Sequence, residues 1–82
     1  MGVDLNAVAM FVRVVECGSF SEAAARLGTP LSTVSRKISE LEESLHVRLL
    51  ERSTRRLRVT EFGQEYYESS RRGLEEIGRA HV

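Results

Sequence analysis

Apolar residues near the start of the chain recur at positions i, i+3, i+4 and i+7, occupied by Val8, Phe11, Val12 and Val15. This spacing places them on one face of a helix. We therefore predict a helix from about Asn6 to Cys17 that buries this face in a core. Asp4 or Asn6 can cap its start, and Gly18 can end it.

A shorter helix is predicted to follow at once. Ser19 and Glu22 have the Ser/Thr-x-x-Glu spacing of a capping box, in which both side chains satisfy free N–H groups at a helix start. An alanine-rich run continues to Leu27, and Gly28 can take the left-handed conformation that ends it. The first turn, with Ser21, could also hold a phosphate, although a plain cap is the alternative role.

A third helix is predicted from Pro30 to about Leu45, with a narrow apolar stripe of Val34, Ile38, Leu41 and Leu45. Thr29 can cap it, Pro30 suits its first position, and His46 stands where a left-handed residue should end it. Two helices joined by so few residues cross steeply, and close approach is allowed by Ala23, Ala24 and Ala25. Residues 19–38 therefore predict a helix-turn-helix.

The outer face of this third helix changes character along its length. Ser32 and Arg36 point away from the apolar stripe, and they are flanked by Thr33, Ser35 and Lys37. The second half presents the carboxylates of Glu40, Glu42 and Glu43. Phosphates repel carboxylates, so such a helix would enter a nucleic-acid groove by its N-terminal half. The alternative is an ordinary exposed helix in which Arg36 pairs with Glu40.

After His46 the spacing of apolar residues is no longer that of a helix. Apolar and polar residues alternate in Leu57–Val59, as in a strand, and Leu49–Arg52 can form its partner strand. The connection Ser53–Arg56 contains no glycine or asparagine, so we expect a loose connection with Arg55 and Arg56 at its tip. A two-stranded ribbon after a helix-turn-helix is a wing, here residues 49–60, and its arginines could reach phosphates or a minor groove.

A long amphipathic helix is predicted from Thr60, a good cap, to near the end of the chain. One face carries Phe62, Tyr66, Ser70, Gly73, Leu74 and Ile77. So small a body cannot cover this face, which indicates a partner helix, and Ser70 and Gly73 would allow close approach. The alternative is a fraying helix cut from a larger protein.

The net charge of the 82 residues is zero, but the charge is unevenly placed. Residues 26–60 hold eight arginines and lysines against four carboxylates, a local net charge of +4. Four of these arginines lie between Arg52 and Arg58. This distribution indicates a polyanion as partner of the third helix and the wing.

Other classes of function find little support in the sequence. It has no apolar run long enough to span a bilayer, and its N-terminus lacks the regions of a signal peptide. The single cysteine, Cys17, cannot form an internal disulfide, and no metal-ligand or catalytic spacing stands out. We expect a cytoplasmic protein that is not an enzyme and needs no metal or cofactor. A module that only pairs chains through the last helix is the competing interpretation, which leaves the arginine-rich wing unexplained.

Four motifs in this order and spacing carry a resemblance: GSFSEAAARLG, STVSRKI, LEESLHVRLLER and RLRVTEFG. The resemblance covers nearly all of the chain, which resembles the N-terminal domain of LysR-type transcriptional regulators. The resemblance implies a mainly α winged helix-turn-helix of bacterial origin in residues 1–60, with a three-helix core and a two-stranded wing. It also implies double-stranded DNA as ligand. Residues 61–82 would be the linker helix of a homodimer, while the effector-binding C-terminal domain is absent from this chain.

The resemblance also implies roles for individual residues. The major groove would be contacted by Leu31, Ser32, Thr33 and Arg36. Backbone and wing contacts would come from Ser21, Ser35, Lys37, Arg52, Thr54, Arg55 and Arg56. This chain departs from the usual pattern at Pro30 and Leu31, where serine and glutamine are frequent, at His46, where glycine is usual, and at Leu50, where phenylalanine is usual. Leu31 can make only apolar contacts, for instance with a thymine methyl group.

Overall fold

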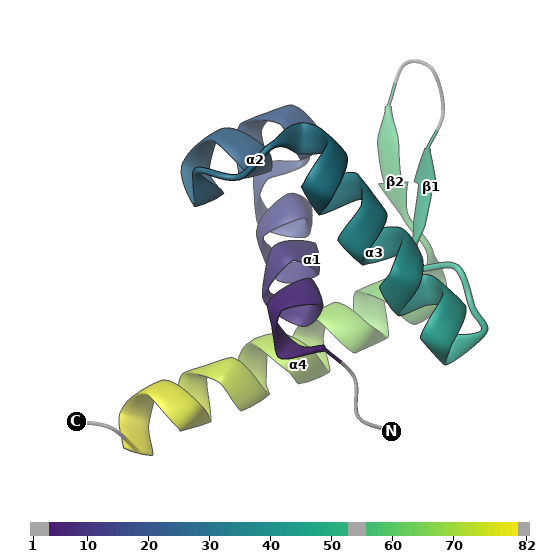
Figure 1. The fold of residues 1–82 in the computed structure, drawn as a ribbon. Coiled ribbons are helices and arrows are strands. Elements are labelled where there is room, and N and C mark those ends of the chain that lie inside the picture. The colour runs from purple at the N-terminus through teal and green to yellow at the C-terminus, as the bar shows by residue number, and fades with distance from the viewer. Residues whose placement is uncertain (1–3, 53–55, 81–82) are drawn as a thin grey trace.

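The computed structural model describes residues 4–52 and 56–80, with side chains as far as Gly73. Its elements, in chain order, are α1 (Leu5–Cys17), α2 (Phe20–Leu27), α3 (Leu31–Leu45), β1 (Leu50–Arg52), β2 (Leu57–Val59) and α4 (Glu61–Ala80). Figure 1 shows α1 in the middle, with α2 and α3 across one end and side of it, the two strands beyond α3, and α4 across its base. The predicted winged helix-turn-helix with a long last helix is confirmed.

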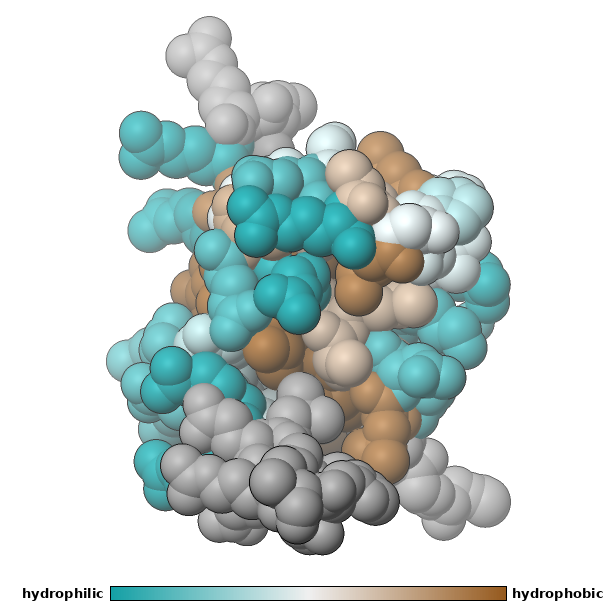
Figure 2. Space-filling model, turned by 90° about the vertical axis from the view of Figure 1, so that its left-hand side faces the viewer, coloured by the Kyte–Doolittle hydropathy of each residue, from teal (hydrophilic) through white to brown (hydrophobic). Residues whose placement is uncertain are grey.

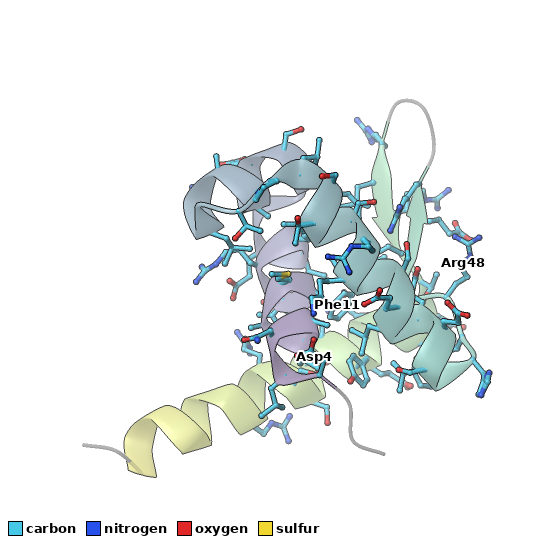
Figure 3. All side chains as sticks on the ribbon, viewed as in Figure 1. Asp4, Phe11 and Arg48 are labelled. Carbon is cyan, nitrogen blue, oxygen red and sulfur yellow. The ribbon has the colours of Figure 1, made fainter. Side chains whose placement is uncertain are left out.

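The core lies where α1, α2 and α3 meet. Phe11 of α1 is fully buried between α1 and α3 (Figure 3), and the fully buried residues around it include Val14, Val34, Ile38, Leu49 and Leu50. The apolar faces predicted for the first and third helices are therefore the ones that fold inward. Ala23 and Ala24 are buried at the helix crossing as expected, whereas Ala25 is exposed and takes no part in it.

Helices α1 and α2 begin and end at residues that favour helix termini. Asp4 caps α1 by accepting from the Asn6 N–H at 2.9 Å, and Gly18 ends it at φ 68°. Ser19 caps α2 by accepting from the Glu22 N–H at 3.2 Å. Only this half of the predicted capping box forms, because the Glu22 carboxylate accepts from Arg26 at 3.1 Å.

The predicted cap of α3 by Thr29 is wrong. Gly28, at φ 63°, and Thr29 donate their N–H groups back to Ala25 and Ala24, and the Thr29 hydroxyl donates to the Leu27 carbonyl. This arrangement closes α2 and leaves Thr29 committed to that helix. Pro30 takes the cap position of α3 instead, without a side-chain hydrogen bond, and its carbonyl accepts from Thr33 and Val34.

The end of α3 is left-handed at His46, with φ 57° and ψ 34°, as predicted. The N–H groups of His46 and Val47 donate to the Glu43 and Glu42 carbonyls. The chain thereby reverses and runs back toward β1. Histidine tolerates this conformation less well than glycine does, so the hydrogen bonds hold it in place.

Glu42 was expected on the exposed acidic half of α3, and that expectation is wrong. Its residue exposure is 8%, and its Oε2 accepts from the Leu49 N–H at 2.8 Å and the Leu50 N–H at 3.0 Å. Strand pairing does not begin until Leu50, so these amides have no earlier acceptor in a ladder. A carboxylate that accepts two backbone hydrogen bonds is well suited to a buried position.

The two strands are antiparallel and pair Leu50 with Val59 and Arg52 with Leu57. Leu50 is fully buried, so leucine fills the core where phenylalanine is usual in the pattern. The strands start at Leu50 rather than at the predicted Leu49, whose N–H is taken by Glu42.

Thr60 caps α4 as predicted, and it also ties this helix to the start of the wing. Its Oγ1 accepts from the Gly63 N–H at 2.9 Å and donates to the Arg48 carbonyl at 2.7 Å, while its own N–H donates to the Leu49 carbonyl at 3.0 Å. Gly63 packs so tightly here that a Cβ atom would overlap the Leu49 carbonyl oxygen. The first turn of α4 is therefore fixed against the body.

The Glu42 contact predicts a loss of stability on truncation. Glu42→Ala removes the acceptor of two buried amides and should lower the free energy of unfolding by about 1–3 kcal/mol, measured by urea denaturation. Glu43→Ala, at the exposed neighbouring position, should stay within about 0.5 kcal/mol of the wild type. Equal effects of the two substitutions would contradict this role for Glu42.

Candidate nucleic-acid interface

The N-terminal half of α3 is exposed and carries hydroxyls and cations. Leu31 is 47% exposed, Ser32 is exposed, and Thr33 is half-buried. These residues and Arg36 thus share an accessible face of α3, as the sequence pattern predicts. The side of the molecule that lies on the left in Figure 1, away from the wing, shows apolar surface among polar residues (Figure 2).

Arg36 projects from this face and pairs with Glu40 one turn further on. The two side chains are 59% and 55% exposed, and Arg36 Nη1 lies 3.3 Å from Glu40 Oε2. The alternative pairing considered from the sequence is therefore present. Exposed pairs of this kind contribute only tenths of a kcal/mol, so a stronger acceptor can displace Glu40 from Arg36.

Lys37 is engaged with the start of the chain. Its Nζ donates to Asp4 Oδ2 at 2.9 Å, and its side chain is 29% exposed. This bond, followed by the one from the Asn6 N–H, lowers the pKa of Asp4 below its usual 3.8. Lys37 thus connects α3 to the cap of α1 (Figure 3, where Asp4 is labelled) and, unlike Arg36, pairs with a carboxylate outside its own helix.

Arg52 leaves β1 and reaches across to α3 and α2. Its guanidinium donates to the Ser35 hydroxyl at 2.9 Å and the Ser39 hydroxyl at 3.2 Å, and lies over the Phe20 ring at 4.7 Å from the centroid. This contact brings the wing to the same end of the molecule as the N-terminal half of α3. The two candidate basic elements are therefore neighbours in space.

The remaining predicted DNA contacts are less fully described. Ser21 lies exposed in the first turn of α2, and Arg56 is exposed at the start of β2. Thr54 and Arg55 lie outside the described residues. The structure therefore brings Arg36, Ser35 and Arg52 together, and Ser21 belongs to a different helix.

The predicted pairing face of α4 is partly used within the chain. Tyr66 is half-buried and its ring lies 5.8 Å from that of Phe11 and 6.4 Å from that of Phe62. Burial raises the pKa of Tyr66, and a hydrogen bond with Ser70 opposes this shift. Phe62 remains 45% exposed, Ser70 and Gly73 are half-buried, and the side chains of Leu74 and Ile77 lie outside the described residues.

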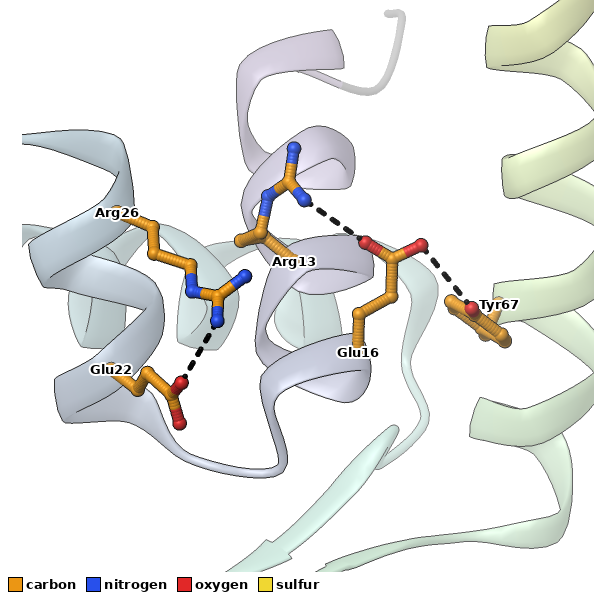
Figure 4. A network of polar contacts seen from close by, with 5 residues as sticks. All are labelled: Arg13, Glu16, Glu22, Arg26 and Tyr67. Carbon is orange, nitrogen blue, oxygen red and sulfur yellow. Dashed lines mark hydrogen bonds and ion pairs between the residues drawn. The ribbon is translucent and has the colours of Figure 1, made fainter.

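A polar contact beside this face fixes α4 to α1. The Tyr67 hydroxyl donates to Glu16 Oε2 at 3.4 Å, and Glu16 Oε1 accepts from Arg13 at 3.3 Å (Figure 4). Phe11, Glu16 and their partners on α4 therefore hold the helix along α1 as well as at its first turn.

Three contributions were missed in the sequence. Glu42 and Gly63 matter through contacts with Leu49, which no local pattern reveals. Arg52 was expected to meet phosphates, and its neighbours within the chain were not foreseen. The sequence offered two signals for these roles. Glu42 is a glutamate beside the apolar stripe of a predicted helix, and Gly63 is a glycine inside a predicted helix.

Two negative findings concern the described residues. Within the ranges 4–52 and 56–80, no helix has the length and apolar character needed to cross a membrane. Over the same residues, histidine, cysteine and carboxylate side chains form no group of three or more that could bind a metal ion.

Comparison with known families gives one match that covers most of the chain. Residues 5–64 match the family described as "Bacterial regulatory helix-turn-helix protein, lysR family". A transcriptional regulator of Xanthomonas campestris pv. campestris is 52% identical over 77 residues, 94% of this chain and 22% of the relative. The regulator CrgA of Neisseria meningitidis serogroup C is 45% identical over 82 residues, 100% of this chain and 27% of the relative. The chain spans about a quarter of the length of these relatives.

Solved structures agree with these matches. The crystal structure of the BenM DBD/catB site 1 DNA complex superposes with a TM-score of 0.90 at 35% identity, covering 94% of this chain and 86% of that one. CbnR, a LysR family transcriptional regulator, superposes with a TM-score of 0.88 at 36% identity, covering 95% of this chain and 27% of that one.

The Asp4–Lys37 pair predicts a pH dependence of stability. Because the pKa of Asp4 is lowered by folding, its charged form stabilises the fold above the unfolded-state pKa, and this contribution is lost as the pH falls through the folded-state pKa. Asp4→Asn keeps a capping oxygen and removes the charge. In urea unfolding, the wild type should exceed Asp4→Asn in stability at neutral pH, and the difference should vanish in acid.

Lys37→Met provides the control, because it removes the partner and leaves Asp4 in place. In the Lys37→Met background, the pH-dependent part of the Asp4→Asn effect should become smaller, because only the backbone bonds, chiefly that of the Asn6 N–H, then lower the pKa of Asp4. A stability difference that is the same at neutral and acid pH would contradict the assignment.

Proposed function

The chain belongs to the LysR family of bacterial regulatory helix-turn-helix proteins, as its DNA-binding domain, and we propose that it binds an interrupted inverted repeat in double-stranded DNA as a homodimer. It is a domain of a transcriptional regulator, not an enzyme. The observation that carries the proposal is the exposed N-terminal half of α3, which presents hydroxyls, a cation and an apolar group, with the basic wing beside it.

Helix α3 is the recognition helix in this proposal. Its N-terminal half enters the major groove, where Leu31, Ser32, Thr33 and Arg36 face base edges. Arg36 exchanges Glu40 for the acceptors of a guanine, which a guanidinium contacts through two hydrogen bonds. Leu31, 47% exposed, offers its apolar surface to a thymine methyl group. Glu40 and Glu43 keep the other half of the helix away from phosphates.

Contacts to the DNA backbone come from the flanks of α3 and from the wing. Ser21, Ser35 and Lys37 approach phosphates on either side of the groove. Arg52, Thr54, Arg55 and Arg56 form the basic side of the wing, whose tip reaches the adjacent minor groove. These contacts hold the register of the complex and make its affinity depend on salt.

Residues 61–82 form the linker helix that pairs two copies of the domain formed by residues 1–60. Phe62, Ser70 and Gly73 offer exposed or half-buried positions along one face of α4, and Tyr66, Leu74 and Ile77 complete the predicted face. A two-fold axis through this pair would set the two recognition helices about 34–36 Å apart, one turn of DNA.

The relatives are about four times as long as this chain. We therefore propose that the complete regulator also contains a C-terminal domain that binds a small-molecule effector, and that it acts in the cytoplasm, where its DNA is. The domain itself requires no cofactor for the contacts described above.

DNA binding is tested by fluorescence anisotropy with the 82-residue chain. A labelled duplex is first selected by the wild-type chain from a random pool, which reveals half-site, spacing and symmetry. Arg36→Ala should then weaken binding to the selected duplex by about 1–3 kcal/mol and reduce discrimination against random duplex. Equal loss on both duplexes would remove the base-reading role of Arg36.

The matched control is Arg13→Ala, which removes the same charge from α1 on an exposed site away from α3. It should leave the discrimination between the two duplexes unchanged. If the wild-type chain binds no duplex at micromolar concentration and low salt, the proposal of DNA binding fails, and a module that only pairs chains becomes the better description.

Pairing through α4 is tested by sedimentation. Phe62→Ala removes an exposed aromatic ring from the proposed interface and should raise the dimer dissociation constant about tenfold or more. Gln64→Ala, exposed on another face of the same helix, should leave it unchanged. Equal dissociation constants for the wild type and Phe62→Ala would place the interface elsewhere.

A further inference from the structure

We propose that Arg52 is a positioning residue: it holds α3 at a fixed angle to the wing and orients the Ser35 hydroxyl toward a DNA phosphate, without binding a phosphate itself. This inference rests on the proposed function, and it changes one part of it: it replaces the direct backbone contact that the resemblance and the proposed function assign to Arg52. It is carried by the contacts that the guanidinium, which belongs to β1, makes with two other elements, α2 and α3.

Both terminal nitrogens of Arg52 already donate hydrogen bonds to α3. Nη1 donates to Ser35 Oγ at 2.9 Å, and Nη2 donates to Ser39 Oγ at 3.2 Å and approaches the Ser35 carbonyl at 3.4 Å. Ser35 and Ser39 are one turn apart on α3. The guanidinium therefore spans a turn of the recognition helix, as its rigid fork of donors allows and a lysine ammonium does not.

The face of the guanidinium is also occupied. Its central carbon lies 4.7 Å from the centroid of the Phe20 ring, at the start of α2. Arginine stacks on aromatic rings in this way while its edges remain free for hydrogen bonds. The Arg52 side chain therefore contacts α2 through the Phe20 ring and α3 through two serines. In this way it fixes the wing to the helix-turn-helix.

The contact determines what Ser35 can offer to DNA. A hydroxyl group has one hydrogen to donate and two lone pairs that accept. Because the Ser35 oxygen accepts from Arg52, its own hydrogen is directed elsewhere. Ser35 flanks the outward face that carries Arg36, where a phosphate oxygen is the acceptor that the bound DNA supplies. The positive charge behind the hydroxyl strengthens it as a donor.

Salt dependence separates positioning from direct phosphate binding. With the 82-residue chain and the duplex selected by the wild type, Arg52→Ala should weaken binding about tenfold, the size of a coupling within one network, with no change in the slope of log K against log salt. Arg56→Ala, which removes a proposed phosphate contact on the same wing, should reduce that slope by about 0.9. A slope reduced equally by both variants would overturn the proposal.

The conservative variant gives a second criterion. Arg52→Lys keeps the charge and loses the fork and the stacking plane, so it should bind as weakly as Arg52→Ala. Near wild-type affinity of Arg52→Lys would show that the charge alone matters, and would overturn the proposal. Ser35→Ala combined with Arg52→Ala should be no weaker than Arg52→Ala alone, because both act through one hydroxyl, whereas additive losses would indicate independent contacts.

Folding of each variant is checked by thermal unfolding. If Arg52→Ala is unfolded, Ser39→Ala serves in its place, because it removes one anchor of the guanidinium and leaves every proposed DNA contact intact. Ser39→Ala should weaken DNA binding about two- to threefold, a loss at the low end of the coupling energies between contacting residues. The slope of log K against log salt should not change. Wild-type affinity of Ser39→Ala would then overturn the proposal. Failure of the wild type to bind any duplex would instead overturn the proposed function.

Discussion

Two backbone amides that follow the end of α3, those of Leu49 and Leu50, find their acceptor in the carboxylate of Glu42. Without it, these two buried amides would lose the acceptor that they share, at a cost in stability. The contact therefore determines where the chain can turn from helix to strand. It places β1 beside α3, and every basic residue of the wing depends on that placement for its distance from the recognition helix.

Leu49 is also the point at which the last helix meets the body. Its side chain is fully buried, its carbonyl accepts from the Thr60 N–H, and it faces Gly63 at close approach. At the start of the wing, Leu49 thus joins α3 through its amide and α4 through its carbonyl. This concentration of contacts explains how a domain with so small a core can hold the helix-turn-helix, the strands and α4 in a fixed relation.

The parts predicted correctly from sequence are those determined by neighbours along the chain. Helical periodicity, the caps at Asp4, Ser19 and Thr60 and the left-handed His46 all follow from local chemistry. Thr29 failed as a cap because the closure of α2 claimed it first. Glu42 was misread, and the contacts of Arg52 within the chain were not foreseen, because their hydrogen-bond partners lie 7 to 17 residues away and sequence pattern gives no measure of such pairings. The proposed base contacts of α3 can be predicted from the residues on its exposed face. The hydrogen bonds of Arg52 with Ser35 and Ser39 beside that face cannot.

Because Gly63 has no side chain, the base of α4 packs directly against the Leu49 carbonyl, which leaves α4 little freedom to rotate there. From that residue to Ala80 the helix extends about 26 Å, so a rotation of about 5° at the base would move its far end by about 2 Å. The rise per base pair of DNA is about 3.4 Å. In the proposed dimer, a rotation of even a few degrees at Gly63 would therefore change the spacing between the two domains by a large part of one base pair, and the close packing of Gly63 against Leu49 would limit that rotation.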